Sequence, residues 1–138
     1  MDQNLTAIRE RVKLFLMDID GLVWDHDSLD EAIRQSMNDL QRVTPIQLSI
    51  AGLDGALVTM LEMGMDGLII RGAACYALQF RIIDRADAYE LGQSRMDLGE
   101  LVEKIQTQYL IDVQKIRSRQ FQMSASVPYF TIPDPDGV

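Results

Sequence analysis

The sequence predicts an α/β fold, in which a mainly parallel sheet forms the middle of three layers in a single domain. A short apolar run, Val12–Met17, ends abruptly in Asp18, Asp20 and Gly21, as is typical of a buried strand. Patterns typical of strands and of helices then alternate, an order that favours parallel strands joined by right-handed helical crossovers. With 138 residues, of which 47% are hydrophobic, the chain is expected to bury one core.

The first half of the chain predicts two helices and one further strand. Ser28-Leu29-Asp30-Glu31 is a capping-box pattern, and the apolar residues after it recur at helical spacing, so we expect a helix over residues 29–42. Residues 45–50 are expected to form a short strand. Residues 54–63 are then expected to form a helix that ends at Gly64.

The second half continues the alternation. Leu68–Ile70 is expected to be a second parallel strand, followed by a helix over residues 73–83. A modest strand is expected over residues 88–91, before a turn at Gly92. Asp97 is expected to cap the longest helix, whose apolar face continues for about six turns.

Asp18 and Asp20 are the first candidates for chemistry. Side chains two residues apart point to the same side of an ideal strand, and ligands of open α/β sheets gather at the carboxyl ends of strands. Two carboxylates held so close either bind a hard cation or share a proton. The alternative is that Asp18–Gly21 is only a turn, since Asp and Gly are common turn residues. The spacing alone leaves both interpretations open.

The segment Leu16–Val23 resembles the first motif of the haloacid dehalogenase (HAD) superfamily of phosphotransferases. The resemblance is closest to the capless branch typified by 3-deoxy-octulosonate 8-phosphate phosphatase, and it implies a HAD-like, Rossmann-like fold with no separate cap domain. That branch has a β-hairpin where residues 29–42 predict a helix. Only the first motif is specific. Weaker similarities follow in the right order, at residues 48–50, 64–72, 92–94 and 121–127.

The resemblance implies a Mg²⁺-dependent phosphatase that acts through an aspartyl-phosphate. Asp18 would be the nucleophile and Asp20 the acid/base, and Mg²⁺ would be held by Asp18 and by the backbone carbonyl of Asp20. The implied substrate is a small sugar phosphate. Its phosphate group would be bound by Arg71, Gly72 and Arg95.

The later motifs of the family are poorly matched. The family has a Thr or Ser where this chain reads Ile70–Gly72, and it has a Lys one position away from Arg95. Its acidic fourth motif is reduced to Asp112, inside the predicted long helix. A group aimed at the transition state is commonly worth about 10²–10³ in rate, so these losses favour a weak or inactive phosphatase.

Composition and charge bound the class of protein. The net charge of −8 at pH 7 argues against a nucleic-acid partner, for which a basic face is the usual footprint. Residues 1–13 lack the apolar core of a signal peptide, and no segment approaches the ~20 apolar residues of a membrane span. A single cysteine, Cys75, excludes an intrachain disulfide framework, so we expect a cytoplasmic protein. Prolines near the end predict an extended tail over residues 128–138, which leaves residues 1–127 as the α/β domain.

Three functions from different classes remain open. The first is a phosphomonoesterase of small sugar phosphates. The second is a noncatalytic relative that binds a phosphorylated ligand or a protein partner through the same cleft. The third is a structural subunit, in which the apolar excess of the long helix drives assembly into a homo-oligomer. Mg²⁺ binding that is lost in Asp18→Asn favours the first two, whereas metal indifference combined with a stable oligomer favours the third.

Overall fold

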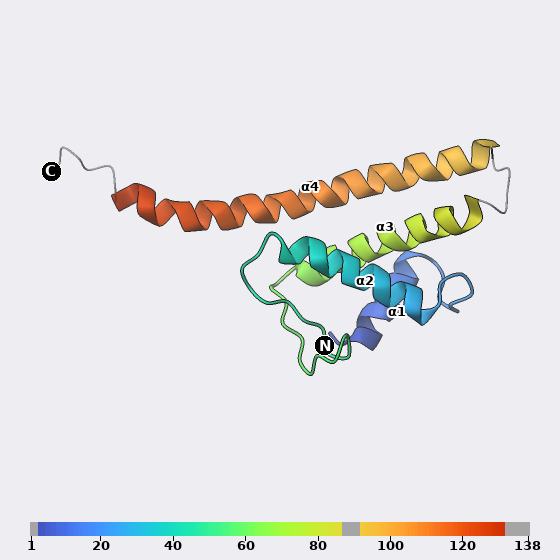
Figure 1. Cartoon of the computed structure of the whole chain (residues 1–138), viewed down its shortest axis with the longest axis horizontal. Coiled ribbons are helices and arrows are strands. Elements are labelled where there is room, and N and C mark those ends of the chain that lie inside the picture. The colour runs from blue at the N-terminus through green and yellow to red at the C-terminus, as the bar shows by residue number, and fades with distance from the viewer. Residues whose placement is uncertain (1–2, 87–91, 132–138) are drawn as a thin grey trace.

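A computed structural model describes residues 3–86 and 92–131, with side chains for residues 3–82 and 99–119. The regular structure of these residues is helical, apart from one isolated antiparallel bridge between Ser49 and Met60. The predicted α/β fold with a parallel sheet is therefore wrong, and so is the Rossmann-like fold that the resemblance implied. The described helices, shown in Figure 1, are α1 (Leu5–Phe15), α2 (His26–Gln41), α3 (Met65–Ala86) and α4 (Gly92–Thr131).

The expected first strand is the last part of α1. Leu5, Ile8 and Val12 are buried at helical spacing, so the apolar row begins well before the run that suggested a strand. The helix starts at a cap, because the Asn4 side chain accepts a hydrogen bond of 2.8 Å from the Ala7 backbone N–H. A helical row that continues upstream therefore explains the apolar residues of this segment.

A tight turn ends α1 inside the first motif. The Asp18 N–H donates to the Lys13 carbonyl at 2.9 Å, and the Met17 N–H donates to the Leu14 carbonyl at 3.1 Å. This pair of bonds defines a Schellman motif, and Met17 takes the left-handed conformation that it requires, with φ +58°. The chain leaves the helix axis here and reaches α2 through the segment 16–25, which we call the α1–α2 loop.

The helix expected over residues 29–42 is confirmed as α2, but it starts earlier. Asp25 caps α2, since its carboxylate accepts a hydrogen bond of 2.8 Å from the Ser28 N–H. Ser28 is therefore inside the first turn and is not the cap that the sequence pattern suggested. The inward face of α2 is formed by Leu29, Ala32, Ile33, Ser36, Asp39 and Leu40.

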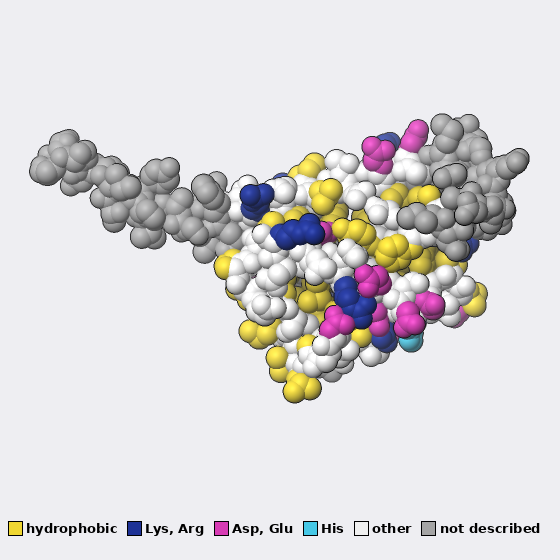
Figure 2. Space-filling model, in the orientation of Figure 1, with side chains coloured by type: hydrophobic (Ala, Val, Ile, Leu, Met, Phe, Trp, Pro, Cys, Tyr) yellow, Lys and Arg dark blue, Asp and Glu magenta, His cyan; other side chains and the backbone are white. Residues whose placement is uncertain are grey.

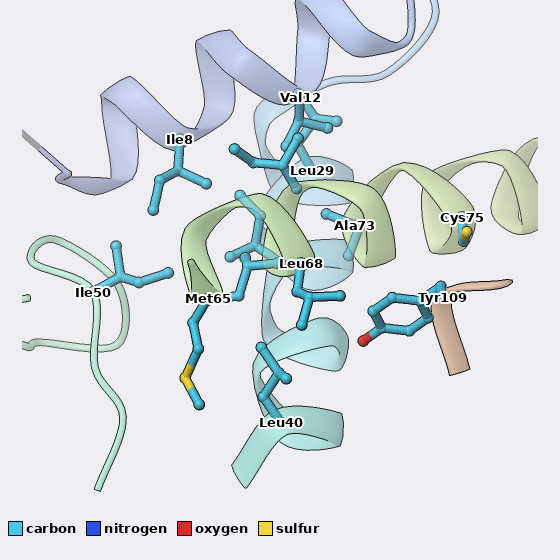
Figure 3. Close-up of a cluster of buried hydrophobic side chains, with 14 of the residues drawn as sticks. Ile8, Val12, Leu29, Leu40, Ile50, Met65, Leu68, Ala73, Cys75 and Tyr109 are labelled. Carbon is cyan, nitrogen blue, oxygen red and sulfur yellow. The ribbon is translucent and has the colours of Figure 1, made fainter. Parts of the chain in front are cut away.

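The central helix of the molecule is α3, which contacts each of the other three helices. The expected strand Leu68–Ile70 is wrong, because these residues form an early turn of α3, and the helix expected over residues 73–83 is part of the same element. A helix with neighbours on several sides is apolar on several faces, which gives a continuous apolar run. Figure 3 shows side chains of α1, α2 and α4 meeting those of α3 in this core.

Residues 42–64 connect α2 to α3, and residues 45–64 of this connection form an irregular segment. The strand expected over residues 45–50 is reduced to the single bridge at Ser49, and the helix expected over residues 54–63 is absent. Asp54 has φ +53°, and Gly52 and Gly55 are also at positive φ, which a right-handed helix does not allow. The segment still contributes to the core, through Leu48, Ile50 and Leu53.

The long helix expected from Asp97 onward is confirmed as α4, although it begins at Gly92. It packs on α3 through Val102, Tyr109 and Val113, and its later part extends past the other helices in Figure 1. It ends at Thr131, beyond the expected start of the tail at residue 128. The strand expected over residues 88–91 and the rest of the tail lie outside the described residues.

Candidate functional site

Asp18 is a structural residue of the α1–α2 loop. Its buried carboxylate accepts hydrogen bonds from the backbone N–H groups of Leu22 at 3.0 Å, Val23 at 3.1 Å and Trp24 at 3.1 Å. Burial by itself raises the pKa of this carboxyl, but these N–H groups and the nearby Lys13 ammonium together hold the pKa of Asp18 below its ordinary value of 3.8. Both oxygens are directed at the loop backbone, so this carboxylate is not presented to a ligand.

The loop that Asp18 organises is anchored on α3 by Trp24. The indole ring is buried, and its N–H donates a hydrogen bond of 2.7 Å to the Ala77 carbonyl. Asp20 lies at the exposed side of the same loop. The two carboxylates of the predicted phosphatase site therefore have different surroundings, one turned inward and one in solvent.

The predicted substrate-binding residues lie elsewhere. The Arg71 guanidinium of α3 is 2.8 Å from the Asp112 carboxylate of α4, which also accepts a hydrogen bond of 3.2 Å from Gln108. Gly72, on α3, faces the Tyr109 ring of α4. Arg95 is in α4, and its side chain lies outside the described ones. The α3–α4 contact thus uses Arg71 and Gly72 for packing, and it shares no hydrogen-bond partner with Asp18 among the described residues.

The described residues contain no group of three or more His, Cys, Asp or Glu side chains placed to hold a metal ion. Mg²⁺ binding stays a prediction. Cys75 is buried in α3, and burial raises the pKa of its thiol to about 11, so the thiol stays protonated near neutral pH.

A polar cluster that the sequence did not suggest joins α2, α3 and α4. The Asp39 carboxylate accepts hydrogen bonds from the Tyr76 hydroxyl at 2.6 Å and from the Tyr109 hydroxyl at 2.9 Å, and the Ser36 hydroxyl lies 3.1 Å from that of Tyr109. Burial, and then the Asp39 charge, raise the pKa of both tyrosines. Ser36 and Asp39 on the apolar face of α2 were the available sequence signal. The cluster joins three helices, and among the described residues no buried side-chain nitrogen or oxygen lacks a hydrogen-bond partner.

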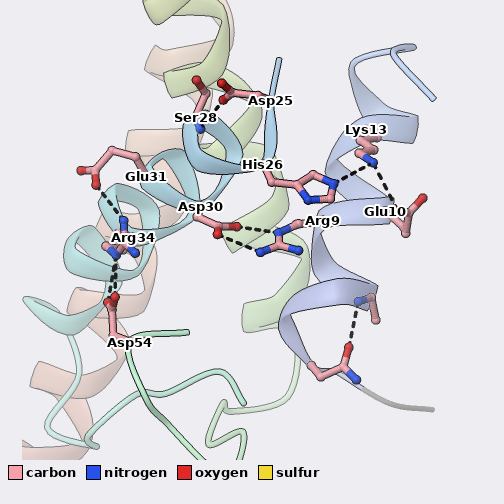
Figure 4. Close-up of polar contacts among 12 residues, drawn as sticks. Arg9, Glu10, Lys13, Asp25, His26, Ser28, Asp30, Glu31, Arg34 and Asp54 are labelled. Carbon is pink, nitrogen blue, oxygen red and sulfur yellow. Dashed lines mark hydrogen bonds and ion pairs between the residues drawn. The ribbon is translucent and has the colours of Figure 1, made fainter. Parts of the chain in front are cut away.

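Ion pairs join α1 to α2, and α2 to the 45–64 segment. Arg9 binds Asp30 of α2 through two hydrogen bonds of 2.6 and 2.8 Å, the geometry shown in Figure 4. Arg34 of α2 binds Asp54 of the 45–64 segment in the same figure. These carboxylates are engaged by arginines, as Asp112 is, and do not converge on a common site.

The outer side of α4 carries exposed apolar residues, as the α1–α2 loop also does at Ile19 and Leu22. Its buried residues recur as Val102, Tyr109, Val113 and Ile116, which directs that row at α3. With 3.6 residues per turn, a second row begins about a quarter turn from the buried row and extends to the opposite side of the helix, and every residue of that row is exposed. We call this row the outward face of α4, and it consists of Thr107, Leu110, Ile111, Gln114 and Ser118.

Charge changes sign along the outward face. Glu100, Glu103 and Lys104 precede it, whereas Lys115, Arg117 and Arg119 lie at its other end, and all six are exposed. Figure 2 shows acidic side chains with a basic one beside them over the right part of α4, and basic side chains over the left part, with hydrophobic side chains between them. The net charge is therefore negative before the apolar centre of the face and positive after it.

The chain matches no protein-family model, and comparisons with curated proteins and with solved structures find no match either. Among the described residues, no helix is both long and apolar enough to cross a membrane.

Proposed function

We propose that this chain is a noncatalytic assembly protein that binds a protein partner through the outward face of α4. The observation that carries the proposal is the two-sided character of this helix. One apolar row is buried against α3, and the outward face leaves Leu110 43% and Ile111 46% exposed. A helix that only covered a core would need one apolar row and would carry charged residues opposite it.

The surroundings of these two residues support the proposal. Single exposed hydrophobic residues are ordinary on protein surfaces, but Leu110 and Ile111 are adjacent and sit among uncharged Thr107, Gln114 and Ser118. An apolar centre with charged residues at its edge is the usual anatomy of a protein interface. A single buried thiol fits a reducing compartment, so we assign the protein to the cytoplasm as part of this proposal.

The side chains that were predicted to act on the phosphate are already hydrogen-bonded or ion-paired within the protein, which also favours a noncatalytic protein. Asp18 accepts hydrogen bonds from its own loop, and Arg71 is paired with Asp112. A nucleophile for phosphorus needs an oxygen that is free to approach it. The Asp18 oxygens would have to leave three backbone N–H groups, which are the bonds that shape the loop.

Phosphate release from a panel of sugar phosphates tests the noncatalytic part. We expect no release above background, with or without Mg²⁺, from the native chain. Asp20→Asn is the informative variant, because Asp20 is exposed and its replacement leaves the loop intact, whereas Asp18→Asn also perturbs the fold. Mg²⁺-dependent release that is abolished by Asp20→Asn would overturn the proposal.

A further inference from the structure

We infer that the partner of the outward face is a second copy of this chain, packed antiparallel about a two-fold axis at Leu110. The inference rests on the proposed function and names the partner of the same face. It follows from the order of the residues along one row of α4.

Three exposed residues define this row. Glu103, Leu110 and Arg117 are each seven residues apart, which is close to two helical turns, so they lie nearly in line on one side of the helix. The apolar residue is at the middle, the acid is toward the N-terminus and the base is toward the C-terminus. A row of this kind is complementary to itself when it is reversed.

Reversal by a two-fold axis at Leu110 pairs every member of the row. Leu110 then faces Leu110 of the second copy, while Glu103 faces the second copy's Arg117, and the same ion pair forms again on the other side of the axis. Thr107 and Gln114 flank the apolar centre with uncharged groups, and Ile111 widens it. The same surface is used by both copies, which is the condition for a closed, isologous dimer.

Parallel packing of the same face is disfavoured by its charges. A parallel pair in register would put Glu103 against Glu103 and Arg117 against Arg117, and like charges at contact distance are repulsive. The antiparallel pair replaces both repulsions by attractions. It also sets the two helix dipoles in opposite directions.

Charge reversal tests the inference on the full-length chain. Sedimentation equilibrium of the native protein is expected to give twice the chain mass of 15.6 kDa. Glu103→Arg and Arg117→Glu should each weaken the dimer by about tenfold or more, because each places two like-charge contacts in the interface. The double variant Glu103→Arg/Arg117→Glu restores opposite charges and should recover the native dissociation constant.

A matched control separates this effect from general charge. Asp20→Arg makes the same change of charge in the α1–α2 loop, away from α4, and should leave the mass distribution unchanged. Circular dichroism of every variant checks that the helices persist. A native chain that is monomeric at every attainable concentration overturns the inference, as does a double variant that stays as weak as the single ones.

Cysteine cross-linking reports the orientation directly. Leu110→Cys should form an intermolecular disulfide on mild oxidation, because the axis passes through this position, and the buried Cys75 does not compete. A mixture of Glu103→Cys and Arg117→Cys chains should cross-link to each other. Cross-linking of Glu103→Cys to itself would instead show parallel packing and overturn the inference.

The proposed function and the inference fail in different ways. Metal-dependent phosphate release refutes the noncatalytic function, whatever the mass of the particle. A monomer without such release refutes the second copy as partner and leaves a different protein as the ligand of the outward face.

Discussion

Met17 is the residue that bears the clearest local backbone strain. It is a non-glycine residue at φ +58° in the turn that ends α1, and its side chain is 81% exposed, so packing does not compensate for the conformation. Met17→Gly is expected to stabilise the protein by about 0.5–1 kcal/mol, measured by urea unfolding. Leu16→Gly is the control. Leu16 has φ −84° and a side chain that packs against the core, so its replacement by glycine both removes that contact and adds freedom to the unfolded chain, and the variant should be less stable.

Gly72 and Gly67 predict opposite outcomes for the same substitution. A Cβ atom on Gly72 would lie 2.6 Å from Cε1 of Tyr109 and closer still to the Ser36 hydroxyl, whereas a Cβ atom on Gly67 would meet nothing within 4 Å. Gly72→Ala is therefore expected to lower the free energy of unfolding by about 1–3 kcal/mol. Gly67→Ala, in the same helix, should raise it by about 0.5–1 kcal/mol. Thermal or urea unfolding of the pair would show both signs, and equal effects would contradict the α3–α4 packing.

Asp18 predicts a dependence of stability on pH. Because its folded-state pKa is below the ordinary 3.8, the charged form stabilises the fold above the unfolded-state pKa, and this contribution is lost as the pH falls through the folded-state value. Asp18→Asn should cost about 1–3 kcal/mol near neutral pH. The difference from the native chain should then shrink below pH 4. Asp20→Asn, at an exposed position of the same loop, should leave the free energy of unfolding near neutral pH unchanged.

The spacing of Asp18 and Asp20 alone did not decide the role of the first motif. Asp18 and Asp20 in front of Gly21 suit a metal site at the end of a strand and also suit a turn, because a carboxylate accepts hydrogen bonds from backbone N–H groups as readily as it binds a cation. The turn interpretation describes the structure. The role of Asp18 depends on whether the residues before it form a strand or a helix. Leu5 and Ile8 extend the buried row of Val12 at helical spacing, so these residues form a helix.

At the scale of elements, the tyrosine pair on Asp39 joins α2, α3 and α4 and predicts an alkaline limit to stability. The pKa of Tyr76 and of Tyr109 is raised above 10, so their contribution is complete below that pH and is lost as the pH rises through the folded-state values. Absorbance of phenolate should therefore show no ionisation of either residue until the protein unfolds. Tyr76→Phe and Tyr109→Phe should leave the titration below pH 10 unchanged, and a lost ionisation step would contradict the cluster.

The long helices α2 and α4 were predictable from an apolar row, and α1 and α3 were not. The row after Ser28 and the row after Asp97 identified α2 and α4, because a long amphipathic helix repeats its signal over several turns. Leu68–Ile70 failed because a helix buried on several sides has no polar face to reveal its period. The run Val12–Met17 failed because a short apolar segment fits a strand as well as the end of a helix.

For the whole molecule, a dimer makes thermal stability depend on protein concentration. If two folded chains associate and unfolded chains do not, the midpoint of thermal unfolding should rise by about 2 °C for each tenfold increase in concentration. The double variant Leu110→Gln/Ile111→Gln should lose this dependence while its helix content persists. A midpoint that is independent of concentration in the native chain would contradict the dimer.

Trp24 is the single tryptophan of the chain, and it is both buried and hydrogen-bonded to Ala77 across the interface between the α1–α2 loop and α3. Its fluorescence is therefore an intrinsic optical probe of that one contact. A local opening of the loop would expose the indole to water and shift its emission to the red, while the helical signal in circular dichroism stayed constant. Detachment of the loop and loss of the helices can thus be followed as separate events in one sample, without adding a label.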